Sequence, residues 1–133
     1  MIKSYKDLDV WKKGIELVEE IYIITKCFPR SEMFGLTSQM RRSAVSISSN
    51  IAEGWMRQHT KEYIQFVYHA LGSCGELDTQ LTIAAGIGYL KVEQAKELHE
   101  SIDCVSKMLR NLVMALYRTG IPKPYTRTPK PDP

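Results

Sequence analysis

Apolar side chains recur every three or four residues along most of this chain, and no stretch alternates apolar and polar residues as a strand does. Four long segments carry this helical spacing. Short breaks at Pro29, Arg57–His59 and Gly86–Gly88 separate them. Because short connections between long helices force neighbouring helices to run antiparallel, the sequence predicts an all-α fold, an antiparallel up-down-up-down four-helix bundle.

The same spacing predicts which side chains face the core. In the first helix, which starts near Ser4 and ends at Pro29, a second apolar row widens the inner face. The predicted inner residues are Leu8, Trp11, Ile15, Val18 and Tyr22, flanked by Val10, Leu17, Ile21 and Ile24, in the first helix; Leu36, Met40, Ala44, Ile47, Ile51 and Trp55 in the second; Tyr63, Val67, Ala70, Cys74, Leu77, Leu81 and Ala84 in the third; and Ala95, Leu98, Ile102, Val105, Leu109, Leu112 and Leu116 in the fourth.

The 133 residues are enough to bury one continuous core, and 44% hydrophobic and 25% charged residues are ordinary values for a globular domain. The bundle is predicted to occupy residues 1–120. Residues 121–133 hold five of the six prolines together with Lys123, Arg127 and Lys130. Because proline at this density cannot continue a helix, this segment is predicted to be an extended or disordered basic tail.

The three cysteines, Cys27, Cys74 and Cys104, are odd in number and widely spaced, with no CxxC pair. This pattern indicates reduced thiols in a cytoplasmic protein rather than a disulfide framework or a zinc site. All three lie at or near apolar helical positions, so we expect small, buried hydrophobic side chains. The polar N-terminus lacks the apolar core of a secretory signal, and the longest uncharged stretch, residues 79–90, is too short to span a bilayer.

The second predicted helix lacks the lysine and glutamate of a usual solvated face. Hydrogen-bonding side chains line it at Gln39, Arg42, Ser46, Ser49 and Glu53, with Ser43, Ser48 and Asn50 beside them, and the third helix has a matching row at Gln65, His69, Ser73, Glu76 and Gln80. Buried polar groups must find partners. We therefore expect a polar network that fixes helix register or a subunit contact, built from Gln39, Arg42, Ser46, Asn50, Glu53 and Glu76. Within it, Arg42 is expected to pair with Glu76 or Glu53; the alternative is a solvated polar face.

Two glycines, Gly72 and Gly75, interrupt the third predicted helix beside this polar row. A glycine inside a helix costs roughly 1 kcal/mol relative to alanine. The sequence therefore predicts close packing at these positions as a compensation.

No recognised catalytic pattern is present. Di-metal sites in four-helix bundles need Glu-x-x-His pairs, and no carboxylate stands three positions before His59, His69 or His99. An arginine four to six residues before a histidine, as in one type of helical ribonuclease, is missing at all three histidines. Neither a G-x-x-x-x-G-K-[ST] phosphate loop nor a G-x-S-x-G nucleophile motif occurs. We expect no enzymatic activity, no metal and no cofactor.

Basic residues cluster modestly around the second predicted helix, at Arg41, Arg42, Arg57 and Lys61. Because lysine and arginine supply phosphate contacts, these four residues and the basic tail form a candidate nucleic-acid-binding surface. The net charge of +3 is mild for this role, and among aromatic residues only Trp55 lies close to the arginines in the sequence. Several chains in a ring would add their fields together, which makes the oligomeric state decisive.

Three segments, YKDLDVWKKG, FPRSEMFGLTSQMRRSAVSISSNIAEG and ALGSCGELDTQL, resemble the four-helix-bundle family of proteins encoded in intervening sequences of 23S rRNA. The resemblance covers roughly residues 5–118. Its most specific part keeps the family's order at Gln39, Arg41, Arg42, Ser46, Asn50, Glu53 and Gly54, positions for which it implies no catalytic role. It implies assembly into a barrel-like homopentamer. Relatives include the accessory protein of diversity-generating retroelements, which binds nucleic acid and a reverse transcriptase through a basic surface.

Two functions are open at this point. The first is a non-enzymatic oligomeric binding protein that contacts RNA, DNA or a nucleoprotein through Arg41, Arg42, Arg57, Lys61 and the tail. The alternative is a protein–protein interaction scaffold that binds no nucleic acid. Neither a membrane partner nor a small-molecule substrate is indicated. The mild charge departs from that of the nucleic-acid-binding relatives.

Overall fold

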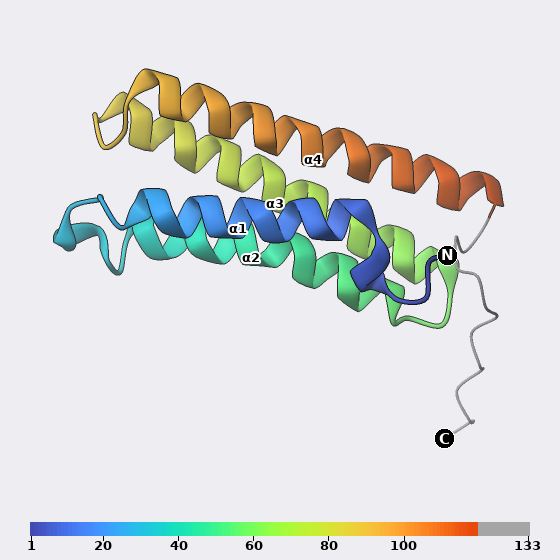
Figure 1. The fold of residues 1–133 in the computed structure, drawn as a ribbon. Helices are drawn as coiled ribbons and strands as arrows, with labels where there is room; N and C mark the ends of the chain where they lie inside the picture. The colour runs from blue at the N-terminus through green and yellow to red at the C-terminus, as the bar shows by residue number, and fades with distance from the viewer. Residues whose placement is uncertain (120–133) are drawn as a thin grey trace.

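Residues 1–119 are described by the structure, a computed structural model, and form four long helices joined by short connections (Figure 1). The elements are a 3-10 turn η1 (Tyr5–Asp7), α1 (Asp9–Thr25), a 3-10 turn η2 (Arg30–Glu32), α2 (Leu36–Trp55), α3 (Thr60–Gly86) and α4 (Val92–Thr119). Consecutive helices run in opposite directions, and no strand occurs among residues 1–119. The predicted all-α four-helix bundle is confirmed. The predicted tail lies outside the described residues.

Helices α2, α3 and α4 bury the faces that the spacing predicts. Of their predicted inner residues, only Leu36 and Leu112 keep part of their surface exposed. α2 packs against both α1 and α3, α4 packs against α3 and α1, and α1 lies diagonally across the bundle from α3. The core is therefore one continuous layer of apolar side chains between four antiparallel helices.

The inner face of α1 differs from the predicted row. Ile15 and Tyr22 are exposed, whereas the flanking residues Leu17 and Ile21 are buried, so α1 is rotated by about one residue, roughly 100°, from the expected orientation. The cause is a close approach at Gly14. A Cβ atom there would collide with Ser48 Oγ, which donates a hydrogen bond to the backbone carbonyl of Trp11 over 3.2 Å. Because position 14 has no side chain, this edge of α1 lies directly against α2.

The connections that precede α2 and α4 meet at one end of the bundle (Figure 1). There, the Tyr89 hydroxyl donates to Glu32 Oε2 over 2.7 Å, and the Tyr89 ring packs on Phe28 with ring centroids 5.3 Å apart. Gly88 provides the sharp turn after α3, with a φ of +84° that side chains rarely adopt. The predicted turn at Gly86–Gly88 is confirmed.

The cysteines were predicted to be buried, and this is wrong for two of them. Cys74 is buried in the core, and its burial raises the pKa of its thiol. Cys27 lies just past the end of α1, and Cys104 points away from the core of α4, between inward-facing Ile102 and Val105; both are exposed. Within residues 1–119, no helix is long and apolar enough to cross a membrane.

Candidate functional site

The four predicted basic residues fall into two pairs. Arg41 and Arg42 lie in the first half of α2, whereas Arg57 and Lys61 flank the α2–α3 connection. At a helical rise of 1.5 Å per residue, the two pairs are roughly 20 Å apart along the bundle. A single chain therefore does not gather them into one compact patch.

Arg41 is held against α1. Its Nε donates to Thr25 Oγ1 over 2.9 Å, and its guanidinium lies 4.5 Å from the centroid of the Tyr22 ring. Thr25 in turn donates to the carbonyl of Ile21 over 2.7 Å. With Arg42, Arg41 also lines a shallow cavity of about 450 Å³ over α1 and α2. Its side chain thus already holds two helices together, and its charge remains at the rim of that cavity.

Arg57 is engaged with acidic residues. Its Nη2 lies 2.9 Å from Glu53 Oε1 and its Nη1 lies 3.9 Å from Glu62 Oε2, while its guanidinium stacks 4.7 Å from the Phe66 ring centroid. Two carboxylates offset its charge locally, so Lys61, which is exposed, is the less compensated member of this pair.

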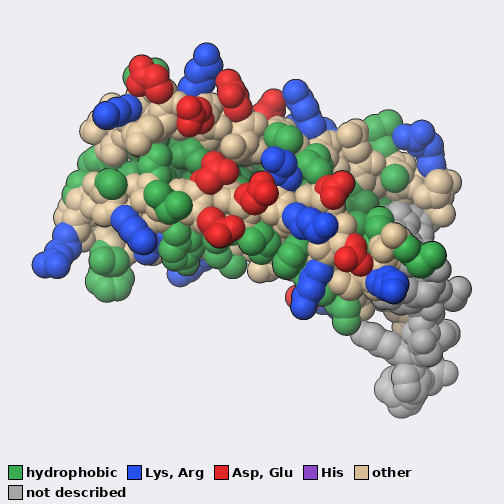
Figure 2. All heavy atoms as spheres, viewed as in Figure 1, with side chains coloured by type: hydrophobic (Ala, Val, Ile, Leu, Met, Phe, Trp, Pro, Cys, Tyr) green, Lys and Arg blue, Asp and Glu red, His purple; other side chains and the backbone are tan. Residues whose placement is uncertain are grey.

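Acidic and basic side chains are interspersed over α1 and α4 on the face seen in Figure 2, with hydrophobic side chains between them. Phosphate binding needs an excess of positive charge. This face therefore has no continuous surface of positive charge. The exposed basic residues on α2 and at the start of α3 remain the candidates for phosphate contacts.

The predicted polar network is partly assembled between α2 and α3. Asn50 Nδ2 donates to both the carbonyl (2.8 Å) and the hydroxyl (2.9 Å) of Ser46. The Ser46 and Ser73 hydroxyls lie 2.8 Å apart, and Ser73 donates to the carbonyl of His69 over 3.2 Å. Because the single Ser73 hydrogen is used in that bond, Ser46 is the donor to Ser73. The chain of bonds therefore runs in one direction, from Asn50 to His69.

The predicted ion pair of Arg42 does not form within the chain. Among residues 1–119, Arg42 reaches neither Glu76 nor Glu53, and Glu53 pairs with Arg57 instead, one helical turn away. Arg42, Glu76 and Gln39 are exposed. Whether they join a subunit contact stays a prediction.

These exposed side chains line a polar groove of about 370 Å³ between α2 and α3, which is bordered by Gln39, Arg42, Ser43, Ser46, Ser73, Glu76 and Gln80. The Ser46–Ser73 contact sets the register of the two antiparallel helices. Ser43 accordingly stands across from Glu76, and Gln39 stands across from Gln80. The Oε1 atom of Gln80 is buried and has no hydrogen-bond partner among the described residues.

The glycines of α3 do not pack closely against any other part of residues 1–119, so the predicted close packing stays a prediction for a subunit contact. A Cβ atom at Gly72 or Gly75 would meet nothing within 4 Å. Both belong to an outward stripe with helical spacing that is made of Gln65, Tyr68, Gly72, Gly75, Thr79, Ile83 and Gly86 and is exposed along most of its length. We call it the α3 stripe. α3 thus has one seam facing the core and a second seam that the other residues of the described range, 1–119, leave uncovered.

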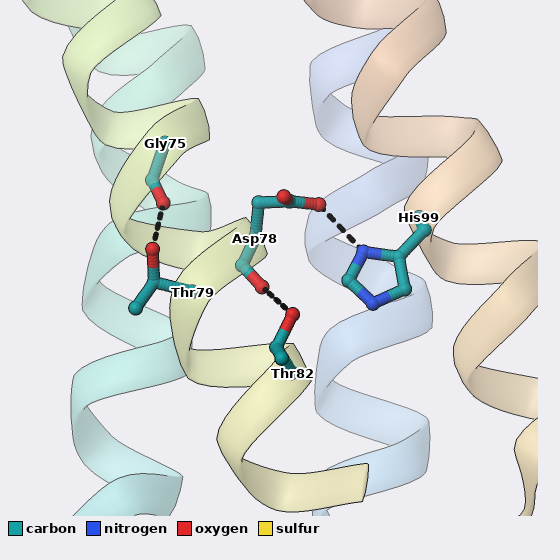
Figure 3. Close-up of polar contacts among 5 residues, drawn as sticks. All are labelled: Gly75, Asp78, Thr79, Thr82 and His99. Atoms are coloured by element: carbon teal, nitrogen blue, oxygen red, sulfur yellow. Dashed lines mark hydrogen bonds and ion pairs between the residues drawn. The ribbon is translucent and has the colours of Figure 1, made fainter. Parts of the chain in front are cut away.

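A histidine–carboxylate contact that sequence reasoning missed joins α3 to α4 (Figure 3). His99 Nδ1 lies 2.6 Å from Asp78 Oδ1. Beside it, Thr82 donates to the carbonyl of Asp78 over 2.9 Å and Thr79 donates to that of Gly75 over 2.8 Å. Asp78 directly follows the inward-facing Leu77, and His99 directly follows the inward-facing Leu98. This adjacency is the sequence signal that could have placed both residues where α3 contacts α4. No group of three or more potential metal-ligating side chains gathers anywhere in residues 1–119.

Comparisons with known proteins agree with this fold. The model of the 23S rRNA-intervening sequence protein family matches residues 6–111. A similar solved structure is a protein of unknown function from the S23 ribosomal protein family of Bacteroides thetaiotaomicron, with a TM-score of 0.73 and 24% sequence identity, covering 78% of this chain and 97% of that one. No sequence among the curated proteins matches. Since the family model spans most of the bundle, the chain belongs to the family of 23S rRNA-intervening sequence proteins.

Proposed function

We propose that this chain is a non-enzymatic, self-associating binding protein whose assembled form contacts nucleic acid or a nucleoprotein. The observation that carries the proposal is the pair of uncovered surfaces on different sides of the bundle. One is the α3 stripe. The other is an apolar patch over α1 and α2, where exposed Tyr22, Met33 and Val45 line one shallow cavity; Ile15 and Phe34 are exposed as well.

The two surfaces differ in the size of their side chains. Small residues along the α3 stripe let another backbone come close, and the α1–α2 patch presents large apolar side chains. Contact between two different surfaces of the same chain is head-to-tail, and such contacts close into rings when the rotation permits. A homopentamer, the assembly that the family resemblance implies, is the ring that we propose.

A ring repeats each basic residue around its axis, and this repetition supports nucleic-acid binding by a chain of mild charge. Arg42 and Lys61 are exposed, and no carboxylate among the described residues forms an ion pair with either. Their fields would add in the assembly. The names of the matched family and of the S23 ribosomal protein family refer to ribosomal RNA and ribosomes, which makes RNA the first nucleic acid to test.

A protein–protein interaction scaffold without nucleic-acid binding is the second candidate. It is favoured by the state of Arg41 and Arg57, because one is stacked on Tyr22 and bonded to Thr25 and the other faces two carboxylates. Two of the four candidate cations are therefore already engaged inside the chain.

Self-association is tested by the mass in solution, measured by light scattering. The wild type is expected to be pentameric. Gly72→Leu is expected to be monomeric, since leucine would fill the α3 stripe and a Cβ atom at this position meets nothing within 4 Å among the described residues. Lys107→Leu, which adds the same side chain to the exposed face of α4, is the control and should stay assembled. A monomeric wild type would contradict the proposal.

Nucleic-acid binding is tested by titrating short RNA and DNA at several salt concentrations. Binding is expected to weaken steeply with salt, and Arg42→Gln and Lys61→Gln should each reduce the salt slope, by about one released ion per substituted contact. Lys91→Gln, which removes a charge near the α3–α4 turn, should leave the slope unchanged. Absence of binding even at low ionic strength would leave the scaffold as the function.

A further inference from the structure

The groove between α2 and α3 holds two opposite charges that form no ion pair with any residue in the described range 1–119. Arg42 lies on the α2 wall and Glu76 lies on the α3 wall, on the same stretch of the groove in the register set by Ser46 and Ser73. Both side chains are exposed, and their charged atoms are more than the 4.0 Å of an ion pair apart. The two walls thus present a cation and an anion across an open space.

The α3 wall is rich in hydrogen-bond acceptors. The carboxylate of Glu76 belongs to it. Gln80, one helical turn away, lines it as well, although its Oε1 atom is buried and so lies out of reach of a ligand in the groove. The hydroxyl hydrogens of Ser46 and Ser73 are already used in the chain of bonds that ends at His69. A ligand group that binds to this wall must therefore donate hydrogen bonds, and a positively charged donor is the best match.

The α2 wall needs the opposite chemistry, a ligand group that accepts hydrogen bonds and carries a negative charge. A guanidinium presents planar, paired donors that match a carboxylate, so Arg42 suits an anionic ligand group. A complementary ligand must carry its carboxylate and its donor cation on one small frame, because the groove measures about 370 Å³. No aromatic side chain is among its seven lining residues, so a nucleobase would find no surface on which to stack.

We propose that this groove binds a free α-amino acid as its zwitterion. The ligand carboxylate lies on Arg42, and the ligand ammonium donates to Glu76. Short side chains at Ser43 and Ser73 leave room for the ligand between the walls. A longer peptide fits poorly, since its ammonium and its carboxylate are at opposite ends. The site does not require nucleic-acid binding, although it shares Arg42 with the proposed nucleic-acid surface, so a phosphate and an amino acid would compete for that side chain.

The test is calorimetric titration of the full-length chain. The standard amino acids are first ranked by the thermal shift that each produces. The strongest binder is then compared with the amine that lacks its carboxylate and with the acid that lacks its ammonium. Each of these is expected to bind at least about tenfold more weakly than the amino acid, because each loses one charged contact.

Matched variants locate the site. Arg42→Gln and Glu76→Gln replace charges by amides of similar size, and each should weaken binding at least about tenfold. Lys91→Gln, on the connection before α4, should bind as the wild type does.

Three outcomes would overturn the site. The first is no saturable binding of any standard amino acid. The second is an amine or acid analogue that binds as tightly as its parent. The third is a loss of assembly mass in both Arg42→Gln and Glu76→Gln, which would assign the two charges to a subunit contact. This last outcome is separable from failure of the proposed self-association, because that failure appears already in the mass of the wild type.

Discussion

Tyr89 donates its hydroxyl hydrogen to Glu32 across the end of the bundle, over 2.7 Å, and so connects the turn after α3 to the loop before α2. The other carboxylate oxygen of Glu32 accepts from the backbone N–H of Leu36 over 3.1 Å. Gly35, the N-cap residue of α2, has no side chain to offer, so Glu32 supplies the missing acceptor. One carboxylate therefore caps a helix and joins two connections.

Tyr89→Phe is expected to lower the melting temperature at neutral pH, because it removes this hydrogen bond while keeping the ring against Phe28. Thermal unfolding followed by circular dichroism measures the change. Tyr22→Phe, which removes an exposed hydroxyl that has no hydrogen bond among the described residues and keeps the ring beside Arg41, is the comparison. An unchanged melting temperature in Tyr89→Phe would show that the bond contributes no stability.

The same bond predicts a pH dependence. The hydrogen bonds from Tyr89 and Leu36 lower the pKa of Glu32 below its ordinary value of 4.5. A carboxyl whose folded pKa is depressed contributes stability above the unfolded pKa and loses it as the pH falls through the folded one. The difference between wild type and Tyr89→Phe is therefore expected to be full at neutral pH and to shrink below about pH 4.5. A difference that grows in acid would contradict this assignment.

Two glycine substitutions should have opposite effects on stability. At Gly54, a Cβ atom would stand 2.9 Å from Phe66 Cβ and 3.2 Å from the backbone oxygen of Tyr63, so Gly54→Ala is expected to cost about 1–3 kcal/mol. At Gly75 a Cβ atom meets nothing within 4 Å, and alanine favours the helix by about 1 kcal/mol. Urea unfolding, at a dilution where the chain is monomeric, measures both. If both substitutions changed the free energy of unfolding in the same direction, the close packing at Gly54 would be refuted.

The thiols should separate into two classes. Cys27 and Cys104 are exposed and are expected to react rapidly with a chromogenic disulfide reagent in the native protein. Cys74 is expected to react only on unfolding, since burial both blocks access and raises the pKa of its thiol. Counting the reacted thiols before and after adding denaturant tests this. Rapid labelling of all three thiols in the native protein would place Cys74 at the surface.

The contact between Asp78 and His99 is expected to contribute little to stability. Both side chains are more than a third exposed (51% and 34%), so solvent screens the interaction, and Asp78→Asn should cost about 0.5 kcal/mol. Asp103→Asn breaks the exposed pair with Lys107 on α4 and is the matched control. Urea unfolding compares the two. A loss far above that of Asp103→Asn would give the α3–α4 contact a structural role.

Helical spacing predicted the fold and three of the four inner faces, because the buried rows of α2, α3 and α4 are each unambiguous. It failed on α1, where two apolar rows lie side by side and both satisfy the spacing. The choice between them depends on Gly14, which acts by allowing close approach to Ser48. Such a contact involves residues far apart in the chain, and spacing along one helix carries no information about it.

Less of the candidate site could be predicted. The polar side chains of α2 and α3 were identified, and Ser46, Asn50 and Ser73 do meet. The prediction chose the wrong partner for Glu53. This carboxylate pairs with Arg57, one helical turn away on its own side of the bundle, and not with Arg42. The exposed cysteines were missed because Cys27 directly precedes buried Phe28 and Cys104 directly precedes buried Val105, and a buried apolar neighbour does not make a position inward-facing.

The antiparallel order of the helices has a kinetic consequence. Each helix packs on the one that follows it, and the connections between them are short, so most contacts join residues close together in the chain. Closing short loops costs little entropy, and bundles dominated by such local contacts fold in microseconds to milliseconds. We therefore expect the monomer to form quickly after synthesis, so that the slow, concentration-dependent step in reaching the working form is the meeting of chains.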